Sequence, residues 1–230
     1  MKPIRAFSAL GILLAAAAAI AQDANLDKVL SQMDASSAKF QDMQADITAD
    51  LYTAVVQDHE MQTGETAFRR VGGSLEMITK ILTDNGQPAE RDILYKNGEL
   101  DFYQPALKQE TIFTSGANRG EYDSLLATGF GATSRDLSAT WTVSFQGMET
   151  VDGVQTAKLD LVPKQANIRN SVSHITIWLD PARDISLKQV MYQPTGDSRT
   201  VTYSNIRYNN HPSASLFTLK LASGTQVQRK

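Results

Sequence analysis

The sequence contains no cysteine, and this absence excludes a disulfide framework, cysteine-bound zinc or iron–sulfur sites, a thiol nucleophile and acylation on a cysteine side chain. Positive charge is also scarce: 22 Lys and Arg face 25 Asp and Glu, and no basic run is longer than the pair Arg69-Arg70. The formal net charge is -3, so the basic surface that binds a phosphate backbone is missing. We therefore expect no nucleic-acid partner.

Residue patterns typical of catalysis or metal binding are missing as well. The three histidines, His59, His174 and His211, lie far apart in the sequence, and none has the spacing of a zinc motif. No Gly-x-Ser-x-Gly turn is present, and Gly129-Phe130-Gly131 lacks the third glycine and the Lys-Ser/Thr of a phosphate-binding loop. The sequence therefore predicts a protein that is not an enzyme and that uses no metal or cofactor.

Long apolar runs are confined to the N-terminus. A short cationic segment precedes an apolar stretch over residues 6–20, and Ala19-Ile20-Ala21 fits the small-x-small rule for cleavage. The stretch is shorter than the roughly 20 apolar residues that cross a bilayer. We expect residues 1–21 to be a secretory signal peptide and residues 22–230 to form a single domain. An exported chain without disulfides suits the bacterial periplasm.

The remaining chain begins with one helical pattern and continues with many strand patterns. Apolar residues recur at helical spacing over residues 25–40, which predicts an amphipathic helix. From residue 44 onward the apolar period changes to two, as at Ala45, Ile47 and Ala49. Turn residues such as Asn97-Gly98 separate these segments. The pattern predicts ten or eleven strands in an antiparallel sheet with one apolar and one polar face.

Helical signals interrupt the strands in the middle of the chain. Residues 121–127 have the pattern of a short helix, and Thr133–Leu137 opens with the spacing of a capping box. The segment Gly129-Phe130-Gly131 lies between them. We interpret this insertion as a short helical lid.

A sheet of this size must curl, split or close, and one helix with a small insertion is too little to cover its apolar face. The predicted fold is mainly β (α+β). It is a curled antiparallel sheet that forms a half-open β-barrel, with the N-terminal helix and the short helical lid on the concave face. Such a shape leaves an apolar cavity, and concave apolar spaces are where ligands bind.

The order of these elements carries a resemblance to a known family. The helical segment is followed by GETAFRR at residues 64–70, KNGELDFYQP at 96–105 and FTLKLASGTQV at 217–227. In this order the motifs resemble the periplasmic outer-membrane lipoprotein carrier family, LolA, over essentially the whole chain after residue 21. The resemblance implies a monomeric carrier whose cavity takes the acyl chains of lipoproteins. An inner-membrane ABC transporter would be the donor and an outer-membrane receptor the acceptor.

The resemblance also implies a role for one arginine. In that family an arginine on an early strand hydrogen-bonds the lid backbone and keeps the empty cavity closed, and the matching position here is Arg70. The chain departs from the family pattern at Val71, where proline is usual, and at Ala67, where a bulky aromatic residue is usual. The alternative for Arg70 is an outward-facing strand arginine paired with a carboxylate, which contributes little to stability.

Acyl chains in water need complete cover, because each exposed methylene costs about 0.8 kcal/mol. Apolar residues of the helix, the early strands and the lid are the candidates for the cavity lining, and each of them is alternatively an ordinary core residue. They are Met33, Phe40, Phe68, Met77, Leu125, Leu126 and Phe130.

Three classes of function stay open, in order of preference. The first is a lipoprotein carrier that shuttles between the inner and the outer membrane. The second is a lipid-binding or envelope-sensing module of the same fold, which would carry phospholipid or another amphiphile and usually has a further domain. The third is an enzyme acting on a lipid or glycan, which would need a polar constellation at the mouth of the cavity. The absence of cysteine separates the chain from the family's receptors, which are anchored through an acylated N-terminal cysteine.

Overall fold

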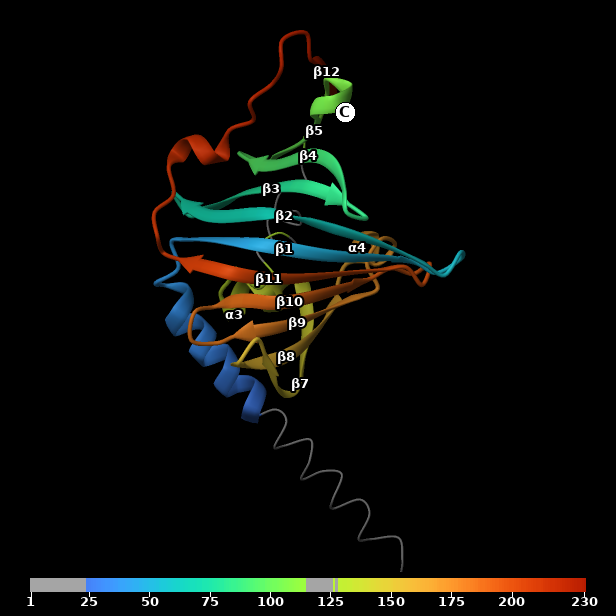
Figure 1. Cartoon of the computed structure of the whole chain (residues 1–230). Helices are drawn as coiled ribbons and strands as arrows, with labels where there is room; N and C mark the ends of the chain where they lie inside the picture. The colour runs from blue at the N-terminus through green and yellow to red at the C-terminus, as the bar shows by residue number, and fades with distance from the viewer. Residues whose placement is uncertain (1–23, 115–125, 127) are drawn as a thin grey trace, which may run out of the picture.

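The computed structural model describes residues 24–114, 126 and 128–230. An N-terminal helix of residues 24–37 precedes twelve strands, which belong to one sheet (Figure 1). The strands are β1 (Asp42–Thr53), β2 (Asp58–Val71), β3 (Ser74–Asp84), β4 (Gln87–Lys96), β5 (Glu99–Gln104), β6 (Gln109–Thr114), β7 (Trp141–Val151), β8 (Val154–Pro163), β9 (His174–Asp180), β10 (Ile185–Tyr192), β11 (Ser198–Tyr208) and β12 (Gln226–Arg229). The short helices are η1 (Pro105–Leu107), α3 (Ser134–Thr140), α4 (Ala166–Arg169) and η3 (Ala214–Phe217).

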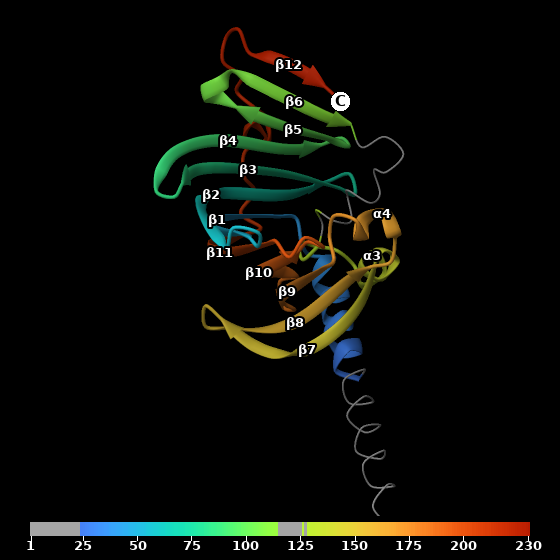
Figure 2. The same cartoon turned by 90° about the vertical axis from the view of Figure 1, so that its right-hand side faces the viewer.

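The strand order is β12-β6-β5-β4-β3-β2-β1-β11-β10-β9-β8-β7, so β12 and β7 are the two edges of the described sheet. Neighbouring strands run antiparallel except for β12, which pairs with β6 in parallel. The sheet curls without closing (Figure 2), which confirms the predicted half-open, mainly β fold. The strand that the sequence did not predict is β12: its four residues are all exposed, so they have no apolar alternation.

Local signals placed several elements correctly. Asn97 and Gly98 both have positive φ, 55° and 80°, and they join β4 to β5 as the Asn-Gly pair predicts. The side chain of Thr133 accepts from the Asp136 N–H at 3.1 Å, and the Asp136 carboxylate accepts from the Thr133 N–H at 3.1 Å. This capping box begins α3 where the sequence predicts it. The helix predicted over residues 121–127 lies outside the described residues, apart from Leu126.

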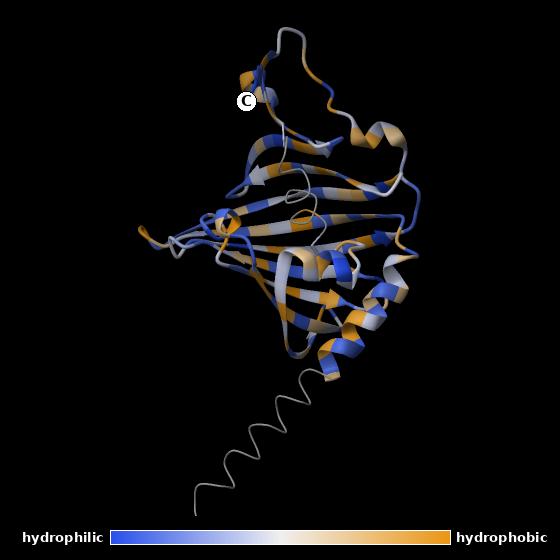
Figure 3. Ribbon diagram, turned by 180° about the vertical axis from the view of Figure 1, so that it is seen from behind, coloured by the Kyte–Doolittle hydropathy of each residue, from blue (hydrophilic) through white to orange (hydrophobic). Residues whose placement is uncertain are grey.

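We call the face of the sheet that carries Ile47, Phe68 and Met77 the inner face, and the opposite one the outer face. Hydropathy alternates along the strands (Figure 3), as expected when one face is buried. At the β7–β9 end, the N-terminal helix and α3 cover the inner face. Their buried side chains form one cluster with those of the strands, which includes Val29, Met33, Leu137, Trp141, Leu159, Leu161 and Ile177.

The N-terminal helix ends earlier than predicted, at residue 37 instead of 40, and a turn follows at residues 38 and 39. Phe40 therefore leaves the helix and joins a second buried cluster over β1–β4, β10 and β11. This cluster also contains Phe130, which precedes α3 in the sequence. Within the described residues, no helix is both long and apolar enough to cross a membrane.

The outer face is covered by the segment that links β11 to β12, which passes over β2–β4 (Figure 1). Phe217 of η3 is fully buried there and shares a small core with Ala67, Ile78 and Leu94. The guanidinium of Arg69 lies 4.2 Å from the centre of the Phe217 ring. Because Ala67 faces this segment, its small side chain leaves room for Phe217, which gives a physical reason for the departure from the family pattern at that position.

Phe217→Ala is expected to lower the free energy of unfolding by about 3–5 kcal/mol, since it removes a fully buried aromatic ring. Leu221→Ala in the same segment is the control, because Leu221 is 43% exposed and should change stability by less than about 1 kcal/mol. Urea denaturation followed by circular dichroism measures both. Small and equal changes in the free energy of unfolding for the two variants would contradict the packing of the β11–β12 segment on the outer face.

Candidate functional site

A cavity of about 350 Å³ lies on the inner face of the sheet, beside the segment that precedes α3. Its volume falls in the lower part of the range of about 300–1,000 Å³ that is typical of ligand pockets. Most of its lining is apolar. The lining residues are Ile47, Thr66, Phe68, Met77, Thr79, Ile93, Leu100, Leu126, Phe130, Ile175, Gln189, Met191, Arg199, Val201 and Tyr203.

Phe130 closes one side of the cavity. Its ring stacks on the Phe68 ring, with the ring centres 4.0 Å apart. It also lies edge to face with the Tyr203 ring, with the ring centres 5.2 Å apart. The flanking backbone is bound to the start of β10, since the Ser186 N–H donates to the Gly129 carbonyl at 2.6 Å. Gly131 has a φ of +70°, and a Cβ there would lie 2.5 Å from the Phe40 ring. This segment is therefore held in place by aromatic packing and by a few backbone hydrogen bonds.

Arg70 joins three parts of the molecule. One guanidinium nitrogen donates to the Gly131 carbonyl, and the other donates to the Ser37 carbonyl at the end of the N-terminal helix, at 3.1 Å. Its backbone N–H donates to the Gln41 carbonyl at 2.7 Å. The Arg70 side chain thus points to the inner face and binds the backbone next to Phe130. This geometry matches a donor to the lid backbone, while a gating role remains a prediction.

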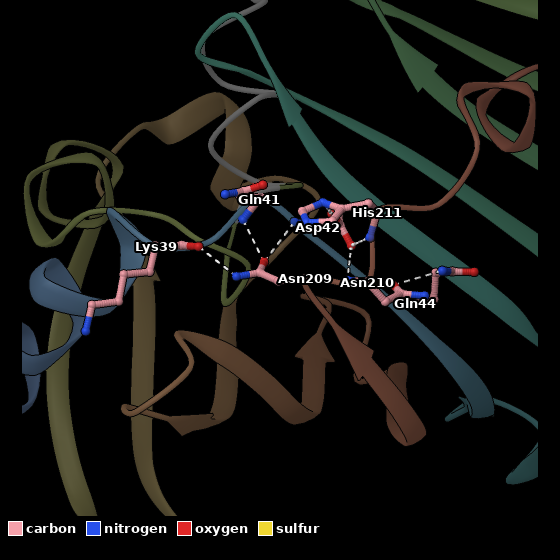
Figure 4. A network of polar contacts seen from close by, with 7 residues as sticks. All are labelled: Lys39, Gln41, Asp42, Gln44, Asn209, Asn210 and His211. Atoms are coloured by element: carbon pink, nitrogen blue, oxygen red, sulfur yellow. Dashed lines mark hydrogen bonds and ion pairs between the residues drawn. The ribbon is translucent and has the colours of Figure 1, made fainter.

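The junction that precedes β1 is itself fixed by polar contacts (Figure 4). The side-chain oxygen of Asn209 accepts from the Gln41 N–H at 2.9 Å, and its side-chain nitrogen donates to the Lys39 carbonyl at 2.8 Å. The buried Asp42 carboxylate accepts from the backbone N–H groups of Asn210 and His211 at 3.0 and 3.2 Å. Residues 209–211, which directly follow β11, therefore hold this junction, and Gln41 of the junction in turn contacts Arg70.

The structure brings together four of the candidate lining residues: Phe68, Met77, Leu126 and Phe130 line the cavity. Phe40 is buried in the same cluster but lies beneath Gly131 rather than at the cavity wall. Met33, a residue of the N-terminal helix, lies in the other cluster because this helix covers the β7–β9 end of the sheet. Leu125 lies outside the described residues.

Sequence reasoning missed the polar residues of the lining. The Thr66 and Thr79 hydroxyls lie 2.8 Å apart, the Gln189 amide donates to the Thr128 carbonyl at 2.8 Å, and Tyr203 contacts Gln189 at 3.4 Å. Arg199 is the charged member of the set. Arg199, Val201 and Tyr203 alternate along β11, so the period of two was the signal that could have placed them on one face.

One buried carboxyl group lies beside the Arg70 contacts. Asp184 is fully buried, and neither of its carboxyl oxygens has a hydrogen-bond partner among the residues that the structure describes. Burial raises the pKa of Asp184 to about 8, against the opposing effect of Arg70, and Asp34 adds to the rise. Its backbone carbonyl accepts from the Gly131 N–H at 3.0 Å. Asp184 therefore supports the segment next to Phe130 through its backbone and holds a proton at neutral pH.

No group of three or more His, Asp or Glu side chains in the described part of the chain is arranged to hold a metal ion.

No family model matches the chain, and no curated protein sequence matches it. Solved structures do match. MucB aligns with a TM-score of 0.53 and 12% identity over 86% of this chain and 63% of MucB, so this chain spans less than two thirds of MucB. An uncharacterized conserved protein from Thermus thermophilus aligns with a TM-score of 0.55 and 11% identity over 90% of this chain and 99% of that protein.

A LolA superfamily protein from Nitrosomonas europaea, NE2245, also matches, with a TM-score of 0.42 and 12% identity over 84% of this chain and 97% of that protein. At 11–12% identity, the likeness of this chain to MucB and to the Thermus thermophilus protein concerns the fold alone.

Asp184→Asn is expected to make stability less dependent on pH. Between about pH 4 and pH 8 the folded wild type keeps a proton on Asp184 that the unfolded chain releases. Its free energy of unfolding therefore falls as pH rises, by up to about 1.4 kcal/mol per pH unit from this group. The variant has no titrating group at this position, so its free energy of unfolding should increase relative to that of the wild type as pH rises.

Urea denaturation at several pH values between 4 and 8 measures this difference. Asp58→Asn, which removes an exposed carboxylate at the start of β2, is the control. Parallel stability curves for Asp184→Asn and the wild type would contradict the account of Asp184.

Proposed function

We propose that this protein is a periplasmic carrier that shields the acyl chains of lipoproteins in its cavity and shuttles them from the inner to the outer membrane. The observation that carries the proposal is the apolar cavity between the inner face of the sheet and Phe130. The likeness of the fold to MucB and the resemblance of the sequence to the LolA family support it.

The cavity suits reversible binding of apolar chains. Met77 and Met191 contribute unbranched, adaptable side chains to its wall, and such side chains adjust to ligands of different shape. The volume is small for several acyl chains, so cargo entry requires the segment around Phe130 to move away. Opening would break the Arg70 hydrogen bond to Gly131, and bound acyl chains would replace the lost aromatic contacts. Arg70 would thereby favour the closed, empty state.

The partners in this proposal follow from the resemblance. An inner-membrane ABC transporter would donate acylated lipoproteins, and an outer-membrane receptor would accept them. Residues 1–21 would direct export and be removed, and the carrier would act as a monomer.

A second candidate is a lipid-binding or envelope-sensing module that carries phospholipid or another amphiphile. The observation that favours it is the fold likeness to MucB, a protein whose structure has also been solved in complex with MucA. Catalysis is not part of either candidate. The described lining residues contribute hydroxyl, amide and guanidinium groups beside the apolar side chains.

Val201→Trp is expected to fill the cavity and to weaken binding of the neutral hydrophobic dye Nile red by at least about tenfold, which corresponds to about 1.4 kcal/mol. Thr202→Trp is the matched control, since the neighbouring residue of the same strand faces the outer side. Dye fluorescence titrations measure both. Equal dye binding by the two variants would show that the dye binds elsewhere.

Arg70→Leu is expected to keep the fold and to retain more ligand, because the closed state loses the hydrogen bond to Gly131 that competes with cargo. Mass spectrometry of material that co-purifies from the periplasm without detergent measures this. We expect acylated peptides or intact lipoproteins, enriched in the variant.

Arg207→Leu is the control for losing an arginine, since Arg207 is an exposed residue of β11. Phospholipid alone would favour the second candidate. Empty wild type and variant, together with exclusion of hydrophobic dyes, would contradict both candidates.

A further inference from the structure

Arg199 places a cationic group in the wall of an otherwise largely apolar cavity. It lies on β11, opposite Leu51 of β1 and Met191 of β10, and it shares its face of the strand with Val201 and Tyr203. The other strands contribute apolar side chains and a few hydroxyl and amide groups to the lining. Arg199 is half-buried with its Nε shielded from solvent, and this placement needs a physical reason, because burying part of a charge without a partner is costly.

The guanidinium of Arg199 has no partner within residues 24–114, 126 and 128–230. Its Nε is buried and makes no hydrogen bond, and no described carboxylate lies within ion-pair distance of it. Arg70, by contrast, has both of its terminal nitrogens bonded to carbonyls. Arg199 is therefore the arginine of the cavity whose hydrogen-bonding capacity is left for a ligand.

The charges nearest to Arg199 do not neutralise it. Burial lowers the pKa of Arg199, Tyr203 opposes this effect, and the positive charge of Arg91 adds to it. Arg91 has its own counter-charges, with Asp84 at 2.8 Å and Glu60 at 3.9 Å. Asp84 and Glu60 are thus engaged by Arg91, and an anion placed beside Arg199 would relieve the repulsion between the two arginines.

Arg199 and Arg70 lie toward opposite ends of the strands. The neighbour of Arg70 on β2, Arg69, pairs with Asp42 of β1, whereas Arg199 pairs with Leu51. Nine residues along a strand correspond to roughly 30 Å at about 3.3 Å per residue. Phe130 packs on Tyr203, which lies about 13 Å along β11 from Arg199, so the cavity has the apolar Phe130 segment toward one end and a cation toward the other. This arrangement matches an amphiphile, which has an apolar chain at one end and a polar head group at the other.

We infer that the cavity takes an amphiphile with an anionic head group, whose carboxylate or phosphate oxygens bind the Arg199 guanidinium while its acyl chain lies against Met191 and Phe130. A guanidinium presents its donors in the fork geometry that such oxygens accept. The inference rests on the proposed function, since the acyl chain must enter this cavity. Entry of an acyl chain into this cavity is common to both candidate functions, and the anionic head group adds a second point of recognition to it.

The test compares palmitate with its uncharged methyl ester by displacement of Nile red from the purified protein. The wild type should prefer palmitate by roughly ten- to a hundred-fold, as expected for hydrogen bonds to a charged group. Palmitoyl lysophosphatidate should share this preference if phosphate oxygens also fit. Arg199→Met should abolish the preference, and Arg199→Lys should keep part of it.

Arg207→Met, which changes an exposed arginine of the same strand, should keep the full preference. Equal affinities of the wild type for palmitate and ester, or a preference that survives in Arg199→Met, would overturn the inference and leave the cavity as an acyl-chain site. Inorganic phosphate that competes as strongly as palmitate would also overturn it. If the wild type bound dye but neither palmitate nor ester displaced it, the proposed function itself would fail. Should Arg199→Met not fold, the wild-type comparison and Arg199→Lys decide.

Discussion

The inner face of the sheet is apolar over nearly all of its strands, and the described helices cover only the β7–β9 end of it. A sheet with an apolar face must bury that face, so the remaining strands curl around their own side chains and around the segment that carries Phe130. The segment that carries Phe130 fills only part of the space inside the curled sheet and leaves a cavity of about 350 Å³. The cavity is thus a consequence of too little helix for too many strands, and the same shortage makes the site accessible to apolar ligands.

Arg70 connects this incomplete cover to the rest of the fold. It binds the carbonyls of Gly131 and Ser37, and its own backbone is bound to the junction that Asn209 and Asp42 hold in place. The cover of the cavity therefore depends on polar contacts at one end, while the packing of Phe130 on Phe68 is the apolar part. A ligand can replace the hydrogen bond of Arg70 to Gly131 and the stacking of Phe130 on Phe68. The cluster that packs the N-terminal helix on the sheet is part of the core and stays intact.

Much of the fold could be predicted from local sequence signals. The Asn97-Gly98 turn, the capping box at Thr133 and the period of two in β1 are each set by neighbours in the sequence, so they are visible without a structure. The outer cover by Phe217 and the short strand β12 depend on partners more than a hundred residues away, and no local pattern reports them. At the site, apolar lining residues such as Phe68 could be predicted from the sequence.

The role proposed for Arg199 was not accessible to prediction, because it depends on the absence of a partner among the described residues of several strands. Two predictions about the lining met the same limit. Met33 has the spacing of a helix stripe, but which end of the sheet the stripe covers is set by tertiary packing. Phe40 was assigned to the helix, and the chain leaves the helix at residue 37 because Asn209 accepts the N–H of Gln41 and fixes the junction there.

The most direct test of an acyl-chain site on the inner face uses the methionine methyl groups as reporters. Met77 and Met191 line the cavity, whereas Met61 and Met148 are 41% and 49% exposed. Methyl NMR spectra would be recorded with stearate that carries a nitroxide near the end of its acyl chain. The account predicts strong broadening of the Met77 and Met191 signals and little change at Met61 and Met148. Broadening that favours the exposed pair, or none at the cavity pair, would contradict it.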